Sequence, residues 1–136
     1  MPVVIDNSVF MAWCMGDEDD PTANNTMLHV IEEGGVVPRI WWYELRNALL
    51  MNERRGRISH QQVADTLADS QALGISFDDG HDEVQVLDLA RRFELTVYDS
   101  AYLEVALRRS LPLATLDDRL RKAAETIGVA VVHYKD

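Results

Sequence analysis

Short apolar runs that end at an aspartate recur along this chain and alternate with stretches of helical spacing. Residues 2–5 precede Asp6, residues 95–98 precede Asp99, and residues 113–116 precede Asp117. A fourth acid, Glu44, lies a turn past the strand-like residues 36–40. In open α/β sheets, chemistry gathers outside the carboxyl ends of the strands. We therefore expect these four acids to converge at one edge of a sheet.

The spacing of apolar residues predicts the elements between these acids. Strands are expected over residues 3–5, 36–40, 75–77, 113–116 and 129–132, whereas residues 95–98 are short for a strand. Helices are expected over residues 8–15, 21–33, 42–55, 59–74, 81–93, 100–109 and 118–127. Ser59 and Gln62 have the spacing of a capping box. Strands that alternate with helices predict a three-layer α/β/α domain with a mainly parallel sheet of four to five strands.

Length and composition favour one soluble domain. The 136 residues are 47% hydrophobic and 26% charged, as is ordinary for a globular protein, and we expect a single domain over residues 1–136. No segment approaches the roughly 20 apolar residues of a membrane span. The first residues show neither a basic region nor a cleavage site, and Cys14 is the only cysteine. A cytoplasmic protein without a disulfide framework is expected.

Carboxylates that converge require a cation. Two like charges about 4 Å apart cost about 4 kcal/mol at an effective dielectric of about 20. Either the pKa values rise or a hard divalent ion binds, and Mg²⁺ or Mn²⁺ suits an all-oxygen site. The net charge of -10 argues against holding nucleic acid by simple electrostatics. The basic residues are nevertheless clustered, at residues 54–57, 91–92, 108–109 and 119–122, where they also suit helix ends.

The short sequence motifs around the four acids also carry information about the protein family. They are VIDNS at residues 4–8, VP at 37–38 followed by ELRNAL at 44–49, YDSAYL at 98–103 and ATLD at 114–117. Together, in this order and over essentially the full chain, they resemble PIN-domain nucleases, and among them the VapC toxins of bacterial and archaeal toxin–antitoxin pairs. The resemblance implies an endoribonuclease dependent on Mg²⁺ or Mn²⁺. It also implies a homodimer that is inhibited by a small cognate VapB-like antitoxin.

The resemblance assigns roles position by position. The family's acidic quartet, which binds the metal and carries catalysis, matches Asp6, Glu44, Asp99 and Asp117. Ser8 and Thr115 match the hydroxyl positions beside the metal. Asn47 matches the amide that often follows the second acid, and three residues along a helix place it on the same face as Glu44.

Two other acids compete for these roles. Asp118 is the alternative to Asp117, but it falls in the first turn of the next helix, where the dipole favours an acid. The Thr-x-Asp spacing also favours Asp117. Glu104 lies five residues after Asp99, which is about 140° around a helix, so it is expected to face elsewhere.

The ligand set itself indicates the chemistry. Divalent ions held by carboxylates lower the pKa of a bound water and stabilise the charge that builds on a scissile phosphate. No protein nucleophile is then required. Asp99 can either orient the attacking water or ligate the metal, and one or two ions can bind.

Competing functions fit less well. The main alternative is a binding module that keeps the PIN architecture without catalysis, but a dead site has no physical reason to keep several like charges together. A haloacid dehalogenase-type phosphatase needs a second aspartate where Ser8 stands. A receiver domain needs a late strand-end lysine, and neither Lys122 nor Lys135 is so placed.

Other reactive and aromatic residues are expected to be structural. The four histidines, at positions 29, 60, 81 and 133, lack the spacing of metal ligands. Cys14 is expected to be a small buried hydrophobe. The aromatic residues at 41–43 are expected to divide between the core and an interface rather than stack on bases.

Overall fold

The computed structural model describes residues 1–16 and 19–132. Its strands are β1 (Val3–Ile5), β2 (Gly35–Pro38), β3 (Ile75–Asp78) and β4 (Leu113–Ala114). The helices in this part of the chain are α1 (Asn7–Met15), α2 (Pro21–Glu33), α3 (Ile40–Arg54), α4 (His60–Gln71), α5 (Glu83–Phe93), α6 (Val97–Arg109) and α7 (Asp118–Thr126). None of these helices is long and apolar enough to cross a membrane.

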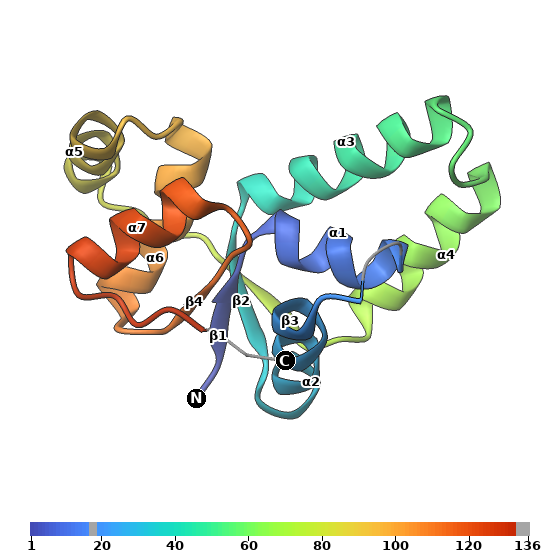
Figure 1. The fold of residues 1–136 in the computed structure, drawn as a ribbon, viewed down its shortest axis with the longest axis horizontal. Helices are drawn as coiled ribbons and strands as arrows, with labels where there is room; N and C mark the ends of the chain where they lie inside the picture. Colours follow the sequence, from blue (N-terminus) through green and yellow to red (C-terminus); the bar gives the residue numbers. More distant parts are fainter. Residues whose placement is uncertain (17–18, 133–136) are drawn as a thin grey trace.

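The strands form one parallel sheet in the order β3-β2-β1-β4. Val4 of the central strand β1 pairs with Val36 on one side and with Leu113 on the other. Helices α5, α6 and α7 lie on one side of the sheet, and α1 to α4 lie on the other (Figure 1). The predicted three-layer α/β/α arrangement is confirmed. The strand expected over residues 129–132 is reduced to a single parallel bridge between Leu113 and Val131.

The core lies between the sheet and the two helix layers. All three residues of β1 are buried, as expected for a central strand covered on both faces. Leu45 and Leu49 of α3 and Leu103 of α6 bury the apolar faces of their helices in this core. Burial of these side chains is the main favourable contribution to folding.

Polar caps determine where several helices begin. Asp20 accepts a hydrogen bond from the backbone of Ala23 at the start of α2. The predicted capping box is present at α4, with Gln62 N donating to Ser59 Oγ at 3.1 Å and Ser59 N donating to Gln62 Oε1 at 2.7 Å. Such caps satisfy backbone N–H groups that the first helical turn leaves unpaired.

Residues 95–98, which are short for a strand, do not form one, and the helix expected from residue 100 begins earlier. Thr96 caps α6, which begins at Val97 instead of at residue 100. Its hydroxyl Oγ1 accepts the backbone N–H of Asp99 at 3.0 Å. Thr-x-x-Asp is itself a helix N-terminus pattern, so this local signal outweighs the apolar character of the run.

The basic clusters mostly lie at helix ends, as expected. Arg54 occupies the last turn of α3, residues 91–92 the last turn of α5 and residues 108–109 the last turn of α6. There they complement the negative end of the helix dipole. The exception is the cluster at residues 119–122, which lies in the first half of α7.

Candidate active site

Asp6 ends β1 and caps α1, and it is only 6% exposed. Its Oδ1 accepts hydrogen bonds from Ser8 Oγ at 2.5 Å and from Val9 N at 3.2 Å. Its Oδ2 accepts one from the hydroxyl of Thr115. Thr115 directly follows β4, the neighbour of β1, so two adjacent strand ends meet at this carboxylate. Both predicted hydroxyl residues therefore hold Asp6 in place.

Asp117 lies two residues beyond Thr115 and caps α7. Its backbone N–H donates to Thr115 Oγ1 at 3.0 Å, and its Oδ1 accepts from Leu120 N at 2.9 Å. Ser8 Oγ accepts the backbone N–H of residue 116 at 3.0 Å, which links this turn to α1. Asp118 differs, because its side chain is 74% exposed and pairs with Arg121 at 2.8 Å.

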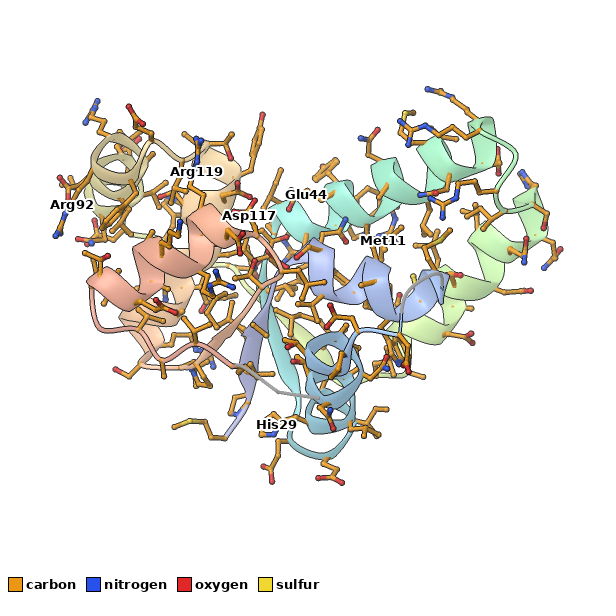
Figure 2. All side chains as sticks on the ribbon, viewed as in Figure 1. Met11, His29, Glu44, Arg92, Asp117 and Arg119 are labelled. Carbon is orange, nitrogen blue, oxygen red and sulfur yellow. The ribbon has the colours of Figure 1, made fainter. Side chains whose placement is uncertain are left out.

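Glu44 reaches the same edge from the second turn of α3. Its Oε1 accepts a hydrogen bond of 2.5 Å from the hydroxyl of Tyr102, a side chain of α6 that is fully buried. Asn7 donates from Nδ2 to the backbone oxygen of Glu44 at 3.4 Å, which ties α1 to α3. Figure 2 shows Glu44 near the start of α3 and Asp117 at the start of α7, both at the upper end of the strands.

Asp99 belongs to the first turn of α6 and does not end a strand. Tyr102 is the third residue after Asp99, so the two side chains share one face of the helix. This spacing is the signal that would have revealed Tyr102 from the sequence. The residue stands in the sequence YDSAYL, but we assigned it no role.

The charges of the quartet act on one another. Burial raises the pKa of Asp6, and the charge of Asp99 raises it further. Burial raises the pKa of Glu44, as do the charges of Asp99 and Asp6. Burial and the charge of Asp117 raise the pKa of Asp99. Among the described residues, no Lys, Arg or His forms an ion pair with any of the four. The four acids therefore form one electrostatic unit with Asp99 at its centre.

Most of the sequence matches a known protein family. The model of the PIN domain family matches residues 3–126. The chain belongs to the PIN domain family. Members of this family are typically metal-dependent nucleases.

Two solved structures resemble the fold of this PIN domain. The crystal structure of PAE2754 from Pyrobaculum aerophilum is 25% identical with a TM-score of 0.68, and the match covers 97% of this chain and 91% of that chain. The crystal structure of FitAcB from Neisseria gonorrhoeae is 17% identical with a TM-score of 0.67, covering 96% of each chain. No curated protein matches the sequence.

The quartet of this PIN domain offers oxygen ligands only, which suits Mg²⁺ or Mn²⁺. As the side chains lie here, no group of three or more His, Cys, Asp or Glu in the described part of the chain is placed to hold a metal ion. Protein donors already engage both oxygens of Asp6 and one of Glu44. Asn7 adds an acceptor beside them, since its Oδ1 is buried and has no hydrogen-bond partner among the described residues. The uncompensated charge and this free acceptor fit a hard divalent cation.

The other residues singled out in the sequence lie outside this constellation. Asn47 is exposed one turn along α3 from Glu44, and its side chain makes no hydrogen bond to another described residue. Glu104 faces away from the quartet and pairs with Arg108 at 2.6 Å. Cys14 is partly buried at the far end of α1, and burial raises the pKa of its thiol to about 11. His133 and Lys135 lie outside the described residues.

The three adjacent aromatic residues divide between core and surface. Trp41 is buried and makes an edge contact with Phe10, with ring centroids 5.4 Å apart. Trp42 and Tyr43 are exposed beside Glu44, and the guanidinium of Arg46 lies 3.8 Å from the centre of the Trp42 ring. One face of α3 thus packs into the core, while its other face carries exposed aromatic side chains next to Glu44 in the sequence.

Proposed function

We propose that this PIN domain is a Mg²⁺- or Mn²⁺-dependent endoribonuclease that acts as the toxin of a VapBC-type toxin–antitoxin pair. The observation that carries the nuclease proposal is the acidic quartet, in which the pKa values of Asp6, Glu44 and Asp99 are raised by burial and by neighbouring carboxylates. None of the four has a basic partner among the described residues. Proteins do not maintain such repulsion without compensation, and a divalent cation supplies it.

Asp6, Glu44, Asp99 and Asp117 would hold the metal. A bound divalent ion lowers the pKa of water and stabilises the charge that builds on a scissile phosphate. The residues of the chain provide the positioning. Ser8 and Thr115 fix the carboxylate of Asp6, and Tyr102 fixes that of Glu44. The raised pKa of Asp99 suits it to orient a water molecule and take its proton.

The hydrolytic route needs no covalent intermediate on the protein. Cys14, the only cysteine, lies at the other end of α1 from Asp6, and its raised thiol pKa of about 11 leaves it protonated near neutral pH. Ser8 engages its hydroxyl with Asp6. Water is therefore the nucleophile that the site supports.

The toxin role rests on the likeness of the four sequence words to VapC toxins. A small VapB-like antitoxin would block the site by placing an arginine or lysine among the acids, since guanidinium pairs bidentately with carboxylate. We further propose that the chain is a single domain that works in the cytoplasm and forms a homodimer through an apolar face away from the quartet.

Cleavage of RNA by the purified protein tests the nuclease. Added Mg²⁺ or Mn²⁺ should support cleavage, and a chelator should abolish it. Asp99→Asn keeps the shape of the side chain but removes the central charge, so this variant should fold and fail to cleave. Undiminished cleavage by protein shown to be free of metal would contradict the proposal.

Growth assays test the toxin. Expression of the wild-type protein should arrest growth, Asp99→Asn should not, and co-expression of the neighbouring reading frame should restore growth. Arrest by Asp99→Asn would instead support the non-catalytic binding module. Normal growth with abundant soluble wild-type protein, and no co-purifying partner, would leave a PIN nuclease with another role.

A further inference from the structure

A pocket lies on the same edge of the sheet as the quartet. It has a volume of about 350 Å³ and is lined by Pro38 and Asp78, the paired last residues of β2 and β3. Asp6 and Thr115 follow β1 and β4, the other two strands in the order β3-β2-β1-β4. The pocket and the acids therefore occupy neighbouring stretches of one carboxyl edge, where ligands bind in folds of this class.

Helices α3 and α6 each contribute residues both to the pocket and to the quartet, and on each helix these residues lie within about one turn of each other. Val97, Ala101 and Val105 of α6 line the pocket at a spacing of four residues, whereas Asp99 lies on the other side of that helix. Ile40 of α3 also lines the pocket, and Glu44 follows four residues later, about 6 Å along the helix axis. A molecule bound at the quartet can thus extend a neighbouring group into the pocket.

The pocket combines apolar walls with one buried carboxylate. Glu104 lines it and is 1% exposed. Its Oε1 accepts from Arg108 Nε at 2.6 Å and from the backbone N–H of residue 82 at 3.0 Å. Its Oε2 has a single contact, 3.5 Å from Arg108 Nη2, which is at the limit of a hydrogen bond. That oxygen retains the capacity to accept a hydrogen bond from a ligand.

We propose that this pocket binds one unpaired base of the RNA next to the phosphate that is cut, and that it favours bases with an exocyclic amino group. This inference rests on the proposed nuclease function. Sequence-specific RNA recognition acts mainly on unpaired bases, which are held against flat or apolar side chains and hydrogen-bonded at their edges. A carboxylate accepts readily from an amino group such as that of cytosine.

Size and charge favour a base over other occupants. At about 350 Å³ the pocket is at the small end of ligand sites. It is too small for a partner helix about 10 Å across. Carboxylates at its wall and rim, from Asp78, Asp79, Glu83 and Glu104, disfavour a phosphate. Arg39 pairs with Asp79 at the rim, and its side chain is 57% exposed, so it can also contact the phosphate backbone of the same RNA strand.

A cycle between enzyme and substrate tests the pocket. The RNA is an oligonucleotide cut by the wild type, made intact or with the base removed on either side of the cleaved bond. Ala101→Leu fills part of the pocket, and Ala68→Leu makes the same change on the exposed surface of α4. Base removal at one position should slow the wild type about 10-fold. Ala101→Leu should cut the intact RNA about 10-fold more slowly and the abasic RNA at the wild-type rate.

Other results would overturn the proposal. An equal loss on both substrates would mean that Ala101→Leu disturbs the acids. If Ala101→Leu no longer forms the dimer in light scattering, the pocket belongs to the contact with a second copy of the chain. If Ala101→Leu no longer binds the antitoxin but keeps its substrate preference, the pocket belongs to the antitoxin interface. Val97→Met, at an exposed lining position, repeats the test if Ala101→Leu fails to fold.

Direct binding separates this inference from the nuclease proposal. In amide NMR spectra, adenosine, cytidine and guanosine should shift the signals of Gly80 and Ala101 in the wild type more than uridine does. The shifts should disappear in Ala101→Leu. Signal shifts without any metal-dependent cleavage would contradict the proposed nuclease activity but support the pocket as a base-binding site. Cleavage without shifts, or equal shifts from uridine, would overturn the base site as described.

Discussion

Two groups of carboxylates meet along α6 and differ in what surrounds them. The acidic quartet of Asp6, Glu44, Asp99 and Asp117 lies at its N-terminal turn, without ion pairs in the described residues. The paired cluster, formed by Asp78, Glu104, Arg108 and Arg109, lies along its second half. In the quartet, burial and the charges of neighbouring acids raise the pKa values of Asp6, Glu44 and Asp99. In the paired cluster, burial opposes but the hydrogen bonds and charge of Arg108 prevail, so the pKa of Asp78 is lowered.

This difference separates acids that lack a basic partner among the described residues from acids that the protein itself pairs with arginine. Arg108 Nη2 donates to Asp78 Oδ1 at 2.7 Å and to Gly80 O at 3.1 Å, while Nε donates to Glu104. These bonds attach α6 to the connection between β3 and α5, and the protein itself supplies both the acids and their basic partners. The quartet lacks such compensation among the residues that the structure describes, which is why we propose that it binds a divalent cation.

The largest effect should come from the quartet and distinguish two adjacent aspartates. Asp117→Asn should lower RNA cleavage about 100- to 1000-fold, because one carboxylate that would hold the charge-stabilising metal is lost. Asparagine caps helices as well as aspartate does, so α7 should remain. Asp118→Asn is the control and should cleave at nearly the wild-type rate. The reverse pattern in initial rates would exchange the two assignments.

Loss of an arginine from the paired cluster should lower the free energy of unfolding. Arg108→Met keeps an aliphatic chain but leaves Glu104 buried without its partner, which should lower the free energy of unfolding by about 3 kcal/mol. Arg109→Met removes one partly exposed contact and should cost less than about 1 kcal/mol. Urea titrations measure both. Equal effects would show that Arg108 does not hold the cluster together.

A smaller effect should come from the hydroxyl that fixes Glu44. Tyr102→Phe should weaken Mn²⁺ binding about 10-fold in calorimetry, because groups that orient metal ligands contribute at that level. Tyr98→Phe, on the same helix, loses an exposed hydroxyl that bonds to no other described residue. Unchanged Mn²⁺ affinity in Tyr102→Phe would leave this hydrogen bond with a structural role only.

The smallest effect should be a pH dependence of opposite sign in the two groups. The raised pKa of Asp99 means that its contribution to stability is fully present below its ordinary value of 3.8 and is lost as the pH rises through the folded pKa. Metal-free Asp99→Asn should therefore melt about 3 °C above the wild type at pH 7, with less difference at pH 4.

Asp78 supplies the opposite case. Its pKa is lowered, so its contribution is present above 3.8 and is lost as the pH falls through the folded pKa. Asp78→Asn should melt below the wild type at pH 7, and the gap should narrow on acidification. Melting curves of both variants from pH 4 to pH 8 test this contrast. If both variants change the melting temperature in the same direction relative to the wild type, the two groups do not differ as proposed.

Local patterns in the sequence were enough for most of the fold. The alternation of strands and helices, the capping box at Ser59 and Gln62, and the stop of α2 at Gly34 depend on residues a few positions apart. So did the placement of Asp117 before α7 and Asp118 within it. The start of α6 was missed because an apolar run suggested a strand, although Thr96 and Asp99 carried the cap signal.

Contacts between distant residues were decided only by the tertiary structure. The sequence determined which acids follow strands or lie on helices. It did not show that Tyr102 meets Glu44, which is 58 positions away, or that Thr115 meets Asp6 across 109 positions. Spacing along the chain reports which face of a helix a residue occupies, and only packing determines what that face meets. For the same reason Glu104 and Asp99, five residues apart on one helix, belong to two different electrostatic environments.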